Sequence, residues 1–219
     1  MSKLIALKEL DQYLKNGITI MVGGFLTNGS PNTIMEYVAN SKIESITLVC
    51  NDAAYANQSF GKLISNRQVK RIITSYVGTN IDAVDQMNNF QLDVEFSPQG
   101  TLVERIRSGG AGLGGVLTPT GLGTVVERGK KIIEVEGKSY ILELPLRADI
   151  AFIKSSIADS SGNLYYKGNS RNFNPIMAMA ADLVIAESDL LVPAGEIKPE
   201  EVHTPSILVD HIYINEKKE

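Results

Sequence analysis

Short apolar runs rich in β-branched residues alternate with helix-like segments along most of this chain. The first four runs are "ITIMVGG" (18–24), "SITLVCND" (45–52), "VKRIITSYVG" (69–78) and "LDVEFSPQG" (92–100). Helical patterns follow the first and third of them, at 31–41 and 81–89. Strands joined through helices form parallel sheets, because a parallel connection has to cross back over the sheet. The alternation therefore predicts an α/β fold with a mainly parallel sheet flanked by helices.

Several further elements complete this predicted fold. We expect an opening helix at about 4–15, a helix over 101–108 that ends at Gly109-Gly110, and a helix over 174–181 with Asn174 as cap and Pro175 as first residue. The run "KKIIEVEGKSYILELPL" alternates around Glu136-Gly137, which predicts an inserted antiparallel hairpin. Further strands are predicted over 148–159, 163–168, 182–188 and 206–214. With no repeat or linker in the sequence, we expect one domain over residues 1–219.

Composition argues against several classes of protein. The net charge of −4 is unlike the basic face of a nucleic-acid binder. No apolar run approaches the roughly 18 residues of a membrane span, and the leucines of the first 14 residues alternate with charges, unlike a signal peptide. The single Cys50 excludes an internal disulfide, and no HExxH or CxxC spacing predicts a metal site. We expect a cytosolic protein with no bound metal, membrane or nucleic acid.

Three predicted strands end in glycine or polar residues: Gly23-Gly24, Asn51-Asp52 and Pro98-Gln99-Gly100. In open α/β sheets, ligands bind beyond the carboxyl ends of the strands. If these strands are parallel neighbours, the three ends meet at one edge of the sheet. The sequence thus predicts a ligand site at that edge.

The stretch "MVGGFLTNGSP" (21–31) is the most distinctive of these strand ends. Gly24 and Gly29 have the spacing of a phosphate-binding P-loop, but Ser30 stands where that loop has its lysine, which argues against a nucleoside triphosphatase. A helix that opens at Pro31 offers free N–H groups to an anion or a polarised carbonyl. Alternatively, the glycines serve only a tight strand-to-helix turn that needs positive φ.

A second glycine-rich stretch, "GGAGLGGVLTPTGLGT" (109–124), contains GxGxxG as Gly110, Gly112 and Gly115. It follows a helix and precedes a strand, the reverse of the dinucleotide-binding context. We expect this loop to face a ligand, and a packed turn is the alternative.

No residue of the chain stands out as a nucleophile. His203 and His211 lie in no GxSxG context and are expected at the surface or on an edge strand, and Cys50 is expected to be a buried hydrophobe. Asp52 and Glu187 are the two acids predicted at strand ends, whereas Glu104, Arg105 and Arg107 are typical of a helix surface.

The run "NGITIMVGGFLTNGSP" (16–31) resembles, at every position, the signature of the α (A) subunit of family I coenzyme A transferases, of the 3-oxoacid and acetate/butyrate–acetoacetate type. The resemblance extends nearly end to end, through "SPQGTLVERIRSGGAGLGG", "GKSYILELPLRADIAFIKSS", "RNFNPIMAMAA" and "EEVHTPSILVDHI". Many relatives carry Glu after the proline, where this chain has Asn32.

The resemblance implies that the catalytic glutamate belongs to a β subunit, in a Ser-Glu-Asn-Gly type of motif. In this chain the nearest sequence, "AESD", lacks the Asn-Gly, so no catalytic residue is expected here. The family pattern assigns CoA contacts to Gly23, Gly24, Phe25, Leu26, Thr27, Asn28 and Gly29. It assigns the substrate pocket to Asn51, Gln99, Gly109, Gly110 and Gly112, with the two amides as donors to an oxyanion or a carboxylate.

The resemblance also implies a function. We expect an α subunit that, with its β subunit in an α2β2 or larger assembly, moves CoA between an acetyl- or butyryl-type acyl-CoA and acetoacetate or a related acid. Acyl-CoA is then a substrate, and no permanent cofactor is expected. The alternatives are a self-contained sugar-phosphate isomerase that uses Asp52 as base, and a non-catalytic acyl-CoA-binding subunit.

Overall fold

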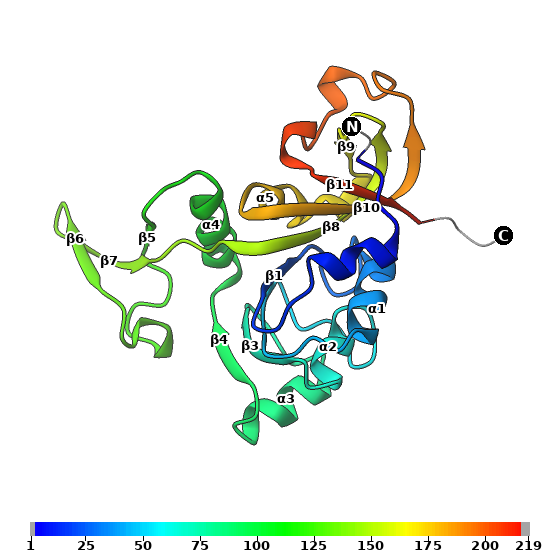
Figure 1. Ribbon diagram of the computed structural model, residues 1–219. Coiled ribbons are helices and arrows are strands. Elements are labelled where there is room, and N and C mark those ends of the chain that lie inside the picture. Colours follow the sequence, from blue (N-terminus) through cyan, green and yellow to red (C-terminus); the bar gives the residue numbers. More distant parts are fainter. Residues whose placement is uncertain (1–2, 216–219) are drawn as a thin grey trace.

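The computed structural model describes residues 3–215, and its centre is an eight-stranded sheet (Figure 1). The strands along the sheet, in spatial order, are β11 (His211–Ile214), β10 (Ala181–Val192), β8 (Ala148–Asp159), β1 (Thr19–Val22), β2 (Ile46–Cys50), β3 (Val69–Thr74) and β4 (Asp93–Phe96). All of these neighbours pair in parallel, and the short β9 (Leu164–Tyr165) pairs antiparallel with β8. The predicted α/β class is confirmed.

Helices cover both faces of the sheet (Figure 1). On one face lie α1 (Asn32–Asn40), α2 (Gly61–Ser65) and α3 (Ile81–Asn88), and on the other lie α4 (Gln99–Gly110) and α5 (Asn174–Met179). Successive strand side chains point to opposite faces. Ile20 and Val22 therefore join the core under α1, while Met21 joins the core under α4 and α5.

Some predicted boundaries are wrong. The opening segment is a short 3-10 helix, η1 (Leu7–Gln12), and the last predicted strand begins as a 3-10 turn, η5 (Ser206–Leu208). The other 3-10 turns are η2 (Val125–Glu127), η3 (Gly168–Arg171) and η4 (Pro199–Glu201). Helix α2 was not predicted, since its five residues are too few to show a helical period.

Two predicted helix starts also shift by one residue. Pro31 is the N-cap of α1, not its first residue. Asn174 is the first residue of α5, after Phe173 as N-cap, and its side chain makes no cap bond. The Asn174 amide is bound elsewhere, to Lys154 and Gly29.

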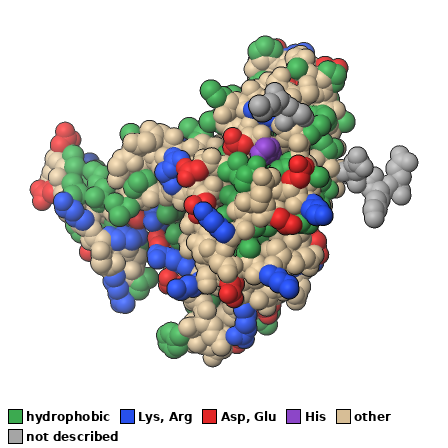
Figure 2. Space-filling view, viewed as in Figure 1, with side chains coloured by type: hydrophobic (Ala, Val, Ile, Leu, Met, Phe, Trp, Pro, Cys, Tyr) green, Lys and Arg blue, Asp and Glu red, His purple; other side chains and the backbone are tan. Residues whose placement is uncertain are grey.

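The predicted hairpin is confirmed as part of a three-stranded antiparallel sheet, β5 (Val116–Thr118), β7 (Lys138–Glu143) and β6 (Ile132–Val135). Glu136 and Gly137 make its turn, with φ of 51° and 72°, values typical of a two-residue hairpin loop. This arm, residues 116–143, projects from the main sheet (Figure 1). Hydrophobic side chains gather on it in Figure 2, and Leu117, Ile132 and Val135 are exposed there.

Buried ion pairs tie the arm to the sheet. Arg105 on α4, expected at the surface, is buried and contacts Glu95 on β4 at 2.6 Å and Glu143 on β7 at 3.7 Å. Glu143 also binds Lys130 at 2.6 Å. Burial alone would raise the pKa of Glu95, but Arg105 and Arg71 outweigh it and hold that pKa below its ordinary value. The arm is therefore fixed to α4 and β4 by a network of ion pairs, in which each buried charge needs its partners.

Candidate active site at the carboxyl edge of the sheet

Strand β1 lies in the middle of the sheet, and later strands are added first on one side of it and then on the other. From β1 the chain adds β2, β3 and β4 on one side, and β8, β10 and β11 on the other. Ligands of open α/β proteins bind in the crevice at such a switch point. The segment 23–29 leaves β1 at this point, where the Gly23 N–H donates to the carbonyl of Phe152 on β8 at 3.0 Å.

The segment 23–29 forms a tight loop. Phe25 and Asn28 exchange two backbone hydrogen bonds of 3.0 Å, and Leu26 between them has φ of 55°, in the left-handed region. A left-handed leucine is uncommon and persists only where its surroundings hold it. Phe25 is 48% exposed at the tip of this loop.

The glycines of this loop face the chain itself. A Cβ on Gly23 would collide with the side chain of Asn174, one on Gly24 with Ser30, and one on Gly29 with Ser170 and Asn172. Glycine is therefore needed here for close approach within the protein. The need for a tight turn therefore explains these glycines. The tip of the loop, from Phe25 to Asn28, faces solvent.

Two asparagines at the start of α5, Asn172 just before the helix and Asn174 as its first residue, hold the loop in place. Asn172 accepts from the Gly24 N–H at 3.1 Å and donates to the Asn28 carbonyl at 3.1 Å. Asn174 donates to the Gly29 carbonyl at 2.9 Å and accepts from the Lys154 N–H at 2.9 Å. Neither asparagine was a predicted site residue. The only local signal was the density of asparagine in "GNSRNFN", and the contact spans more than half the chain.

The polar residues that follow β2 and the first residue of α4 do meet at this edge. The Gln99 side-chain amide donates to Oδ1 of Asn51 at 2.7 Å, and Nδ2 of Asn51 donates to Oδ2 of Asp52 at 2.7 Å. Asp52 also accepts from the N–H groups of Leu26 and Ala54, each at 2.8 Å. Gln99 is the first residue of α4, whereas a polar turn had been predicted.

This arrangement supplies neutral hydrogen-bond donors. Among residues 3–215, the amide nitrogens of Asn51 and Gln99 each make one of their two possible donations. Gln99 is exposed and can offer its second N–H to a ligand, whereas Asn51 is only 2% exposed. Asp52 is only 2% exposed and both of its oxygens are occupied. Burial raises the pKa of the Cys50 thiol well above its ordinary value, which makes it a poor nucleophile.

The second glycine segment lies away from this point. Gly109 and Gly110 end α4, which has 12 residues, and so lie about 16 Å along the helix from Gln99. A Cβ on Gly109 would meet the Leu146 carbonyl, and one on Gly110 would meet Met179. The assignment of Gly109, Gly110 and Gly112 to the substrate pocket stays a prediction, and the two glycines that end α4 do not lie beside Gln99 in this structure. Gly112 is exposed, with φ of 69° and open space around it.

The remaining candidates serve the fold. Glu187, predicted at a strand end, lies inside β10 and accepts from the Ile34 N–H at 2.9 Å, in the first turn of α1. It replaces the cap that Pro31 cannot supply. His203 accepts from the Tyr166 N–H at 3.1 Å, and burial, with Arg171 nearby, lowers its pKa. His211 lies on the edge strand β11, as predicted.

Neither a metal site nor a membrane span is found in the part of the chain that the structure describes. No group of three His, Cys, Asp or Glu within residues 3–215 could hold a metal ion. No helix among those residues is both long and apolar enough to cross a bilayer.

Comparison with known proteins finds relatives along nearly the whole chain. A family model described as coenzyme A transferase matches residues 5–215. The chain is 52% identical over 211 residues to the acetoacetyl-CoA:acetate/butyrate CoA transferase alpha subunit of Clostridium acetobutylicum, covering 96% of this chain and 97% of the relative. It is 45% identical over 216 residues to the acetate CoA-transferase subunit alpha of Escherichia coli K12, covering 99% and 98%.

Solved structures share the fold at lower identity. An acyl-CoA transferase from Escherichia coli O157:H7, in a thioester complex with CoA, superposes with a TM-score of 0.86 at 19% identity. That match covers 100% of this chain but 48% of the longer protein. Glutaconate coenzyme A-transferase from Acidaminococcus fermentans gives a TM-score of 0.86 at 21% identity, covering 97% of this chain and 75% of the other.

Proposed function

The chain belongs to the coenzyme A transferase family as an α subunit, and we propose that it acts with a β subunit to move CoA between a short-chain acyl-CoA and a carboxylic acid. The acyl group is of acetyl or butyryl size, and the acid is acetoacetate or a related compound. Relatives at 52% and 45% identity are named for acetate, butyrate and acetoacetyl-CoA, which supports this substrate class.

One observation carries the proposal: the edge of the sheet offers hydrogen-bond donors but no nucleophile. Asn51 and Gln99 each keep a second N–H, whereas the Asp52 carboxylate is buried with both oxygens hydrogen-bonded and the Cys50 thiol is buried. A site of this kind can bind and polarise a carbonyl but cannot attack it. The attacking carboxylate then comes from the β subunit.

The reaction proceeds by group transfer through that glutamate. Its carboxylate attacks the acyl carbonyl of acyl-CoA, the C–S bond breaks, and a mixed anhydride and CoA thiolate form. The thiolate attacks the glutamyl carbonyl and releases the donor acid, leaving a glutamyl-CoA thioester. The acceptor acid reverses these steps. In each addition, the second N–H groups of Asn51 and Gln99 donate to the developing oxyanion.

The loop at residues 23–29 contributes through its tip. Because its glycines face Ser30 and the 170–174 segment, CoA meets the side chains of Phe25 to Asn28. We place the assembly, an α2β2 heterotetramer or larger, in the cytosol, in short-chain fatty-acid and ketone-body metabolism. The whole chain, residues 1–219, acts as one domain in it.

The test uses the chain alone and with its β subunit. Transfer of CoA from acetyl-CoA to acetoacetate should require both chains. Borohydride reduction in the presence of acyl-CoA should modify a glutamate of the β chain, located by peptide mass mapping. Transfer by the isolated α chain, or modification of one of its own glutamates, would refute the shared site. Sugar-phosphate isomerase activity of the chain alone is not expected, since Asp52 is only 2% exposed and both of its oxygens accept hydrogen bonds.

A further inference from the structure

The projecting arm has one covered face and one apolar face that is exposed. Successive side chains of a strand point to opposite faces, and residues paired directly across two strands share a face. The apolar face consists of two such pairs and one residue beyond them: Leu117 with Leu142, Ile133 with Tyr140, and Val135. Leu117 and Val135 are 43% and 42% exposed, and the other three side chains are partly exposed.

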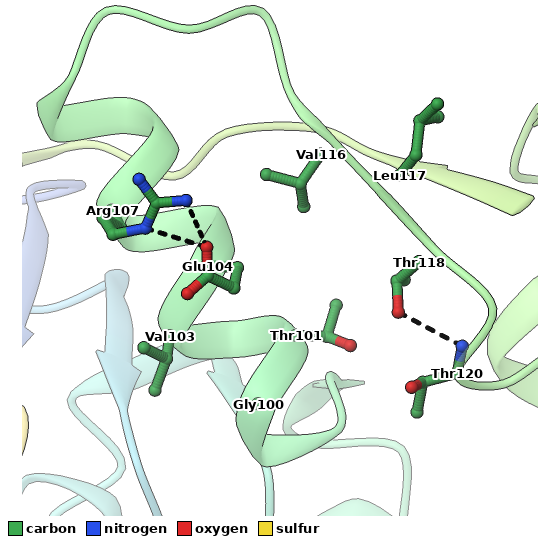
Figure 3. A pocket seen from close by; sticks show the side chains of 9 residues that line it. All are labelled: Gly100, Thr101, Val103, Glu104, Arg107, Val116, Leu117, Thr118 and Thr120. Atoms are coloured by element: carbon green, nitrogen blue, oxygen red, sulfur yellow. Dashed lines mark hydrogen bonds and ion pairs between the residues drawn. The ribbon is translucent and has the colours of Figure 1, made fainter.

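The opposite face of the arm is covered by the chain itself. On that face Ile141 is fully buried, and Glu143 is buried against Arg105 of α4. In Figure 3, Val116 points from β5 toward α4, whereas Leu117 points to the other side of the strand. The attachment of the arm to α4 therefore uses one face and leaves the apolar face exposed.

The apolar face has the composition of a protein interface. All five of its side chains are aliphatic or aromatic, and the charged Glu136 and Lys138 lie at the hairpin end. Protein interfaces combine an apolar centre, in which tyrosine is enriched, with a polar rim. A contiguous apolar surface on a projecting arm (Figure 1) is therefore expected to be covered by another chain.

The size of the apolar face limits which chain can cover it. Three strands of up to six residues span about 14 Å by 20 Å, or roughly 300 Å². A stable interface needs about 800 Å² from each partner. Two arms packed face to face would therefore not hold a dimer together. The chain that covers this face must also be bound elsewhere on the subunit.

The arm lies next to the site that needs a second chain. A cleft of about 730 Å³ separates α4 from β5, with Gly100 and Thr101 on one side and Thr118 and Thr120 on the other (Figure 3). Gly100 directly follows Gln99, one of the two amides that we propose bind substrate. A β subunit that brings its glutamate to Gln99 therefore also reaches the arm.

We propose that the apolar face of the arm docks an apolar surface of the β subunit. The inference rests on the proposed transferase function and names a surface that holds this partner outside the site itself. The arm then contributes to the assembly of the two chains, while the edge of the sheet contributes to the reaction.

Photo-crosslinking in the α–β complex identifies the chain that covers the face. Val135 is replaced by p-benzoylphenylalanine, which its exposure allows without a change to the fold. Ile207 is the matched control, because it is 89% exposed and lies on η5, outside the arm. We expect a crosslink from position 135 to the β chain, located by peptide mass mapping, and none from position 207.

Charged variants measure how much the face contributes to assembly. Leu117→Glu and Val135→Glu each place a carboxylate in the apolar interface, so each should raise the dissociation constant of the complex by at least about tenfold. Ile207→Glu should leave it unchanged. Mass photometry on dilution measures the dissociation constant, and the melting temperature of each α chain shows that its fold is intact.

Other outcomes overturn the inference. A crosslink from position 135 to a second α chain would make the face a contact between α subunits. No crosslink to any chain, or equal dissociation constants for Leu117→Glu and Ile207→Glu, would exclude the face from assembly. Each of these results leaves the transferase function standing if the unaltered complex transfers CoA. If the unaltered chains did not associate or transferred no CoA, the proposed function itself would fail.

Discussion

Replacing Asp52 by Asn should destabilise the protein far more than this nearly isosteric change suggests. The buried carboxylate accepts three hydrogen bonds, from the backbone N–H groups of Leu26 and Ala54 and from the Asn51 amide. Leu26 and Ala54 both have left-handed backbones, with φ of 55° and 53°. Asp52 thus holds two unfavourable conformations and orients the Asn51 amide, which we propose binds substrate.

The magnitude follows from counting these bonds. The least costly orientation of an asparagine at this position puts its NH₂ group in place of the oxygen that accepts from Ala54. The Ala54 N–H then faces another N–H and has no acceptor, which costs about 1 to 3 kcal/mol. The two bonds that survive, to Leu26 and Asn51, lose their charge and weaken by roughly 1 kcal/mol each. We therefore expect a loss of about 3 to 5 kcal/mol in the free energy of unfolding.

Urea unfolding of the α–β complex, at one protein concentration, measures this loss. The matched control is Asp149→Asn, because Asp149 is exposed and accepts one backbone bond, from the Thr19 N–H at 2.8 Å. That variant should lose less than about 1 kcal/mol. Amide hydrogen exchange of the peptide around Leu26 should also speed up in Asp52→Asn. Equal, small losses for the two variants would refute the role assigned to Asp52.

Three further predictions concern other parts of the chain. Gln99→Ala should lower kcat of the complex by about a hundredfold while assembly, followed by size-exclusion chromatography, stays intact, and unchanged turnover would remove Gln99 from the site. Gly23→Ala should lower the melting temperature because its Cβ collides with Asn174, and Asn174→Ala should offset part of that loss in the double variant; additive losses would argue against the collision. Burial raises the pKa of Asp159, but hydrogen bonds from the side chain and N–H of Asn163 and from two other backbone N–H groups outweigh it and lower that pKa. The ionised carboxylate therefore stabilises the folded protein above about pH 4, and this stabilisation is lost as pH falls through the lowered pKa. Asp159→Asn should flatten the acid side of the stability profile measured by urea midpoints, and an unaltered profile would contradict this.

The sequence predicted those elements whose pattern is local. The strand over 148–159 was located to the residue, because a buried strand between turn residues has clear ends. The meeting of Asn51 and Gln99 was also predicted, since parallel strands bring their carboxyl ends to one edge. Both results depend only on period and topology.

What could not be predicted depends on contacts between distant segments. Arg105 lies between two acidic neighbours in space, Glu95 and Glu143, yet in the sequence it is one charge among several on a helix. Glu187 likewise caps a helix 153 positions away. Periodicity cannot distinguish such residues from a solvated surface, because their partners come from other elements.

The hydrogen bonds that hold the loop at residues 23–29 also affect the order in which the protein folds. The hydrogen bonds from Asn172 and Asn174 to this loop join positions 144 to 148 apart in the chain. Contacts of such long range form late, because the loop they close costs entropy before any bond forms. During synthesis, the loop emerges long before the asparagines that hold it. The edge that we propose binds CoA is thus completed only after most of the subunit has been translated, so a truncated chain would present β1 and β2 without a finished site.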